Sequence, residues 1–80
     1  MTINQAIREI MTLRGIRAIR LAERLGISRP TMSQRLNDKS NWTTDTACSM
    51  AKMLDYRVVL VPAEARLPKD SFIIESSDDE

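Results

Sequence analysis

The stretch LAERLGISRPTMSQRL, residues 21–36, decides the fold of this 80-residue chain, because it holds two short helical patterns joined by one glycine. The first pattern predicts a helix over residues 18–25, whose inward side chains are Leu21, Ala22 and Leu25. Gly26 can adopt the left-handed conformation that other residues resist, so it ends this helix. A tight turn follows.

The second pattern begins with Ser28, which can cap a helix by accepting a hydrogen bond from the amide of Thr31. Pro30 falls in the first turn of that helix, where its missing N–H costs nothing. These signals predict a helix over residues 29–36 that packs at a steep angle to the preceding one, with inward side chains from Met32 and Leu36.

Two further helices flank this pair. An apolar stripe from Thr2 to about Arg14 predicts a first helix that ends at Gly15, with apolar positions Ile3, Ala6, Ile7, Ile10, Met11 and Leu13. Thr43 is a suitable cap for a fourth helix that runs to Leu54. Trp42, just before it, is interpreted as a packing residue.

After Asp55 the composition changes. Residues 56–61 are rich in β-branched side chains and are closed by Pro62, which predicts a strand, and residues 72–74 can pair with it as a hairpin. We therefore expect a mostly α fold in three parts: a helical domain over residues 1–55, a β extension over 56–75 and a disordered acidic tail over 76–80.

The charge is divided unevenly along the chain. Residues 1–57 hold ten Lys or Arg against five acidic residues, whereas residues 58–80 hold two against six. A basic body with an acidic end favours a polyanion as the partner of the body.

The sequence lacks the residues that several classes of function require. One cysteine, Cys48, and no histidine exclude an internal disulfide and a Cys/His metal site, and Cys48 is interpreted as a small core residue. With no phosphate loop, paired carboxylates or nucleophile with a base, we expect no enzyme activity, no cofactor and no small-molecule substrate. No apolar run approaches the ~18 residues of a membrane span, so we expect no membrane partner and a cytoplasmic location.

Two short helices around a glycine turn, packed on a first helix and closed by a fourth, resemble the helix-turn-helix of the phage-repressor family, also called Cro-like or XRE. The residues that carry the resemblance are LAERLGISRPTMSQRLNDKSN (21–41) and TTDTACSMAKML (43–54). With the first helix it covers about residues 2–54. The resemblance implies that helix 29–36 enters the major groove of DNA, which admits an α-helix and presents a distinct pattern for each base pair.

The chain departs from the family pattern at two places. The family usually has Ser or Thr followed by Gln where this chain has Arg17 and Ala18, so the customary Gln contact to phosphate is absent. Asp38 also replaces a Gly that is common in the family after the helix at 29–36.

Candidate DNA contacts follow from helix geometry and side-chain chemistry. With Met32 inward, Pro30, Gln34 and Asn37 point most directly outward. Gln pairs well with adenine, and Arg pairs well with guanine. The candidate base-reading residues are Arg29, Pro30, Thr31, Ser33 and Gln34. The candidate phosphate-binding residues flank them: Arg17, Arg20, Lys39, Ser40, Asn41, Thr43 and Thr44. Three other arginines, Arg8, Arg14 and Arg24, are interpreted as a solvated face.

The predicted strand is apolar on both faces, so it needs a partner. Either it packs across the first and fourth helices, or it pairs with the same strand of a second copy through Val58, Val59, Leu60 and Val61. A twofold homodimer of that kind reads a palindrome in double-stranded DNA.

The sequence therefore predicts a sequence-specific DNA-binding transcriptional regulator, most simply a repressor that binds a palindromic operator as a homodimer. An alternative is an antitoxin or a phage-encoded inhibitor, in which the C-terminal segment binds a partner protein.

Overall fold

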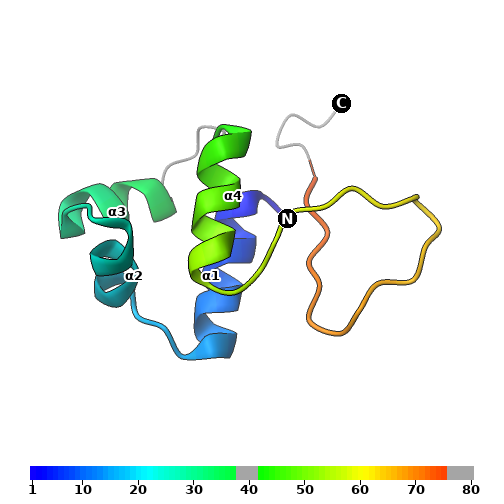
Figure 1. Ribbon diagram of the computed structural model, residues 1–80, viewed down its shortest axis with the longest axis horizontal. Helices are drawn as coiled ribbons and strands as arrows, with labels where there is room; N and C mark the ends of the chain where they lie inside the picture. The colour runs from blue at the N-terminus through cyan, green and yellow to red at the C-terminus, as the bar shows by residue number, and fades with distance from the viewer. Residues whose placement is uncertain (38–41, 76–80) are drawn as a thin grey trace.

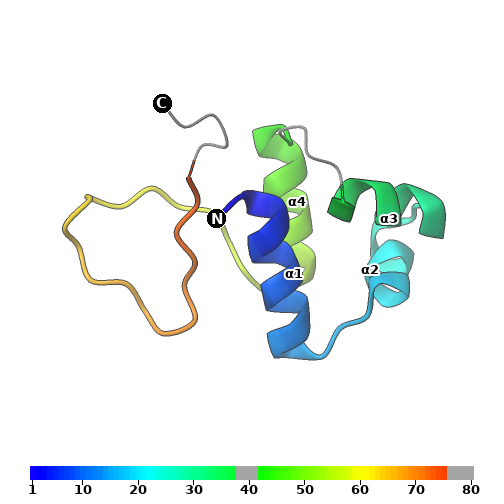
Figure 2. The ribbon, with the colours of Figure 1, turned by 180° about the vertical axis from the view of Figure 1, so that it is seen from behind.

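The computed structural model describes residues 1–37 and 42–75, and these form four helices in the predicted order: α1 (Ile3–Arg14), α2 (Ala18–Leu25), α3 (Arg29–Asn37) and α4 (Thr44–Met53). In Figure 1, α1 and α4 stand in the middle of the molecule, α2 and α3 lie on one side of them, and the C-terminal segment lies on the other. The view from behind shows the same three-part arrangement (Figure 2).

Local signals set the bounds of the helices. At the start of α1, the Thr2 hydroxyl accepts from the Gln5 amide at 3.3 Å while the Gln5 side chain accepts from the Thr2 amide at 2.9 Å, which is a capping box. Gly15 and Gly26 end α1 and α2 at φ values of 66° and 70°. After Gly26, the Ile27 amide donates to the Ala22 carbonyl at 3.0 Å, and this bond closes the tight turn.

One aliphatic core joins all four helices. Its fully buried large side chains come from α1, α2, α3, α4 and the residue that follows α4; they are Ile7, Leu21, Met32, Met50 and Leu54. The predicted inward position of Leu13 is wrong, since this side chain is 54% exposed. Leu13 lies in the last turn of α1, and the end of this helix extends past α4 in Figure 1.

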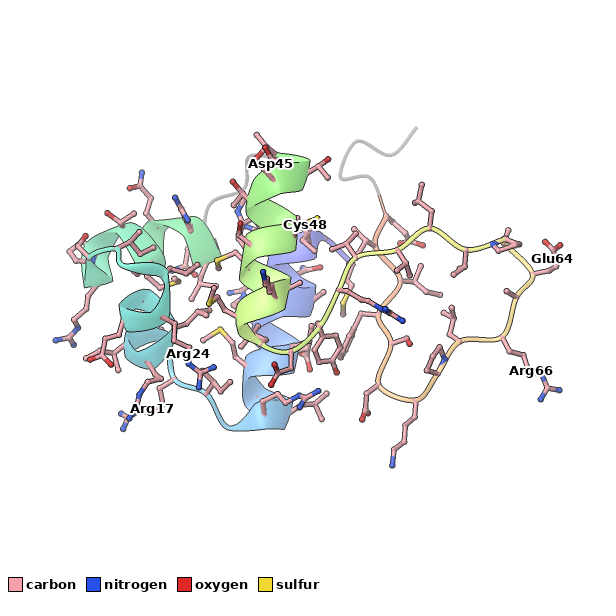
Figure 3. The ribbon with its side chains drawn as sticks, viewed as in Figure 1. Arg17, Arg24, Asp45, Cys48, Glu64 and Arg66 are labelled. Carbon is pink, nitrogen blue, oxygen red and sulfur yellow. The ribbon has the colours of Figure 1, made fainter. Side chains whose placement is uncertain are left out.

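Cys48 is also not the core residue that was expected. It is exposed on α4 (Figure 3), because the buried positions of that helix are Met50 and Ala51. In the part of the chain that the structure describes, no three His, Cys, Asp or Glu side chains form a group able to hold a metal ion.

Residues 54–75 contain no strand, so the predicted strand at 56–61 and its hairpin with 72–74 are not formed in the single chain. The end of this segment turns to the start of the chain instead, where the Glu75 amide donates to the Met1 carbonyl at 2.9 Å. A lone two-stranded ribbon is marginal in water, and among the described residues none covers Leu60 of the predicted strand, which is 100% exposed.

An aromatic contact fixes the two ends of the C-terminal segment. The Tyr56 hydroxyl donates to the Asp70 carbonyl at 3.0 Å, and the rings of Tyr56 and Phe72 lie 6.3 Å apart. The Arg14 guanidinium of α1 lies over the Tyr56 ring, 5.2 Å from its centroid, a favourable cation–π distance. The segment is thereby attached to the helical body at its base.

Between these fixed ends the segment projects away from the body, with Glu64 and Arg66 at its outer end (Figure 3). Its apolar side chains are exposed: Val58, Val59, Leu60, Val61, Leu67, Ile73 and Ile74. The expectation that 58–61 pack across α1 and α4 is therefore wrong.

Among the described residues, no helix is long and apolar enough to cross a membrane.

The turn at Gly26 makes a stability prediction. A Cβ at this position meets no heavy atom within 4 Å, so any cost of a substitution comes from the left-handed backbone. We expect Gly26→Ala to lower the free energy of unfolding by about 1–2 kcal/mol, measured by urea denaturation. Gly26→Asn should cost less, because Asn tolerates this conformation. Equal losses in Gly26→Ala and Gly26→Asn would contradict the explanation.

Candidate nucleic-acid interface

The third helix is buried on one side and exposed on the other. Met32 and Leu36 are 1% and 7% exposed, and through them α3 packs against α1 and α2. Ile27, in the turn before α3, is half-buried against the same core. The helix is therefore held by its inner side, and its outer side is left free to meet a partner.

The C-terminal end of α3 is held by two hydrogen bonds to one oxygen. The carbonyl of Arg35 accepts from Asn4 Nδ2 of α1 at 3.0 Å and from the indole Nε1 of Trp42 at 3.3 Å. Asn4 is buried, and Trp42 packs against the core, which confirms its predicted packing role. The last carbonyls of a helix lack partners within the helix, so these donors satisfy one of them and fix where α3 ends.

The N-terminal end of α3 is capped as predicted. The Ser28 hydroxyl accepts from the Thr31 amide at 3.2 Å and donates to the Thr31 hydroxyl at 2.8 Å. The Thr31 oxygen is thereby oriented, and its own proton remains available for an outside acceptor.

All five candidate base-reading residues lie on the exposed side of α3 or at its start: Arg29, Pro30, Thr31, Ser33 and Gln34. Within the described residues, no partner holds the side chains of Arg29 and Gln34. The C-terminal segment does not cover them either, since α1 and α4 lie between that segment and α3 (Figures 1 and 2).

The candidate phosphate-binding residues of α2 are exposed at its start. Arg17 is the N-cap residue and its side chain makes no capping bond; it projects from the body in Figure 3. Arg20 forms an ion pair with Glu23 at 3.7 Å, with both side chains about two-thirds exposed. Such an exposed pair is weak, so Arg20 can exchange it for a phosphate.

The remaining candidates lie before and at the start of α4. Thr43 caps this helix by accepting from the Thr46 amide at 3.1 Å, and Thr44 is exposed in its first turn. Asp45 stands beside them at the tip of α4 (Figure 3), where a carboxylate disfavours a close phosphate. Three other candidates, Lys39, Ser40 and Asn41, lie outside the described residues.

Sequence reasoning missed three interhelical donors. Asn4 lies on the same side of α1 as Ile7 and Met11. A polar residue on such an apolar stripe is the signal that could have revealed its role. Two arginines taken as a solvated face make contacts to other helices: Arg24 Nη1 donates to the Met53 carbonyl at 2.9 Å, and Arg8 Nη1 donates to Asn37 Oδ1 at 3.5 Å.

A helix exposed on one side, set by a tight glycine turn against a shorter helix and flanked by cationic side chains, defines a helix-turn-helix protein. The model of the Cro/C1-type HTH DNA-binding domain family matches residues 6–58. This is more than half of the chain, which therefore belongs to that family, as the resemblance predicted. No curated protein and no solved structure matches it.

The contact between Asn4 and α3 makes a second stability prediction. Asn4→Ala removes one of the two donors to the Arg35 carbonyl, while Trp42 still donates to it. The free energy of unfolding should therefore fall by about 1 kcal/mol. Urea denaturation measures the loss. Glu9→Ala, at an exposed position of the same helix, is the matched control and should stay within about 0.5 kcal/mol of wild type. Equal stability of the two variants would contradict the role given to Asn4.

Proposed function

We propose that this DNA-binding protein is a sequence-specific regulator of transcription, most simply a repressor that covers a promoter or its own operator. The observation that carries the proposal is the one-sided burial of α3, whose inner side is fixed in the core while its outer side is exposed and polar. A short rigid helix of this kind fits the major groove of B-DNA.

In this proposal α3 reads the bases, and its neighbouring elements bind the phosphates. Arg29 reads guanine at the leading end, and Gln34 reads adenine five residues further along. Pro30 or Thr31 contacts a thymine methyl group, and Ser33 lies beside them. The start of α2 and the residues around the start of α4 hold the phosphates on either side, and those contacts fix the register of the helix without reading the sequence.

We propose a twofold homodimer as the binding unit, formed through Val58, Val59, Leu60 and Val61. These four side chains are 47–100% exposed, although they are the β-branched and aliphatic types that strands bury. Pairing of the segment with a second copy buries them and supplies the missing strand partner. A twofold dimer presents two copies of α3 to a palindromic operator.

Gln34 provides the test of base reading. Gln34→Ala should cost about 1–3 kcal/mol of binding free energy on the preferred operator and relax the preference at one base-pair position. Selection from randomised duplexes gives the preferred sites of both proteins, and fluorescence anisotropy gives the affinities. Ser49→Ala, exposed on α4, serves as the control. A loss in Gln34→Ala that is equal on all sequences would remove Gln34 from the reading residues.

Leu60 provides the test of the dimer. Leu60→Lys places a charge at the centre of the proposed contact, and because Leu60 is fully exposed in the single chain, the helical body should remain folded. We expect light scattering at tens of micromolar to show a dimer for wild type and a monomer for Leu60→Lys. Ala65→Lys adds the same charge elsewhere on the segment and should stay dimeric. A wild-type monomer would favour the alternative, in which this segment binds a partner protein.

A further inference from the structure

Arg8 is an exposed side chain of α1 that reaches the end of α3. Its Nη1 donates to Asn37 Oδ1 at 3.5 Å, and Asn37 Nδ2 in turn donates to the Ser33 carbonyl one turn back along α3, at 2.9 Å. The Asn37 amide is thus oriented by its own helix with its oxygen toward Arg8. A guanidinium has five N–H donors, and this single long bond leaves most of them for another acceptor.

Asn37 places Arg8 at the edge of the reading side of α3. Residues three and four apart share one side of a helix, so Asn37 lies on the side that carries Ser33 and Gln34. A group bonded to Asn37 therefore borders the surface that faces DNA in the proposed complex.

Arg8 also shares a hollow with Arg17. This open hollow has a volume of about 450 Å³ between α1, the α1–α2 turn and α3, and its apolar lining includes Met11, Ile16 and Leu36. Two cations over an apolar surface complement the DNA backbone, in which an anionic phosphate adjoins a largely apolar deoxyribose.

We propose that Arg8 binds a backbone phosphate of the DNA, with Asn37 as its positioning residue and with Arg17 on a neighbouring phosphate across the hollow. The deoxyribose between the two phosphates lies against the apolar lining. The inference rests on the proposed function, and it extends the interface beyond the helix-turn-helix onto the first helix.

The second arginine of α1 provides an internal control. Arg14 is six residues from Arg8, which at 100° per residue places the two side chains about 120° apart around the helix. Arg14 lies over the Tyr56 ring, on the side of the C-terminal segment. Arg8→Gln and Arg14→Gln therefore remove the same charge from the same helix on different faces.

The experiment measures the affinity of the full chain for its selected operator between 50 and 200 mM salt. Loss of one phosphate contact lowers the slope of log K against log salt by about 0.9. The affinity of wild type should thus fall about 3.5-fold more over this range than that of Arg8→Gln. Arg14→Gln should keep the wild-type slope, and Arg8→Lys should restore most of it. The base preference should be unchanged in all three variants.

Asn37 is tested in a double-variant cycle. If it acts through Arg8, Asn37→Ala weakens binding in the wild-type background and has no further effect in Arg8→Gln. Additive losses would overturn the positioning role. Equal slopes for Arg8→Gln and Arg14→Gln, or a changed base preference in Arg8→Gln, would overturn the phosphate contact. Failure of the wild-type chain to bind any selected duplex would instead refute the proposed function itself.

Discussion

The structure depends on how one carbonyl oxygen, that of Arg35, is satisfied near the end of α3. Two donors reach it from different parts of the chain: Asn4 from the first turn of α1, and Trp42 from the approach to α4. A buried polar group without a partner costs free energy, so neither donor can be moved without loss. Their convergence fixes α3 against the two central helices, and the direction of its exposed side follows.

The shortness of α3 is part of the same constraint. Two buried side chains, Met32 and Leu36, anchor this helix of nine residues, which leaves the rest of its surface polar. An isolated helix of that length is not stable in water. Its stability therefore comes from the core below it and from its two fixed ends, Ser28 at the start and the Arg35 carbonyl near the end. The outer side can then be polar without weakening the fold.

The parts of the fold that sequence could predict are those set by local signals. Gly15 and Gly26 end their helices and Ser28 caps α3 as expected, because a cap is decided within a few residues. The contacts that orient α3 could not be predicted in this way, since the donor Asn4 and the acceptor Arg35 are 31 residues apart. The strand was mispredicted for a related reason: β-branched composition indicates a preference, but a strand forms only where a partner supplies its hydrogen bonds.

The first helix separates two surfaces of the molecule. Arg8 faces the end of α3, whereas Arg14 lies over Tyr56 at the base of the C-terminal segment. Because α1 and α4 stand between α3 and that segment (Figure 1), the surface around Leu60 is separated from the exposed side of α3. Burial of such a side chain stabilises a complex by about 25 cal/mol per Å², and this gain is independent of DNA contact. The exposed side of α3 and the exposed side chains at 58–61 therefore lie on opposite sides of the α1–α4 pair.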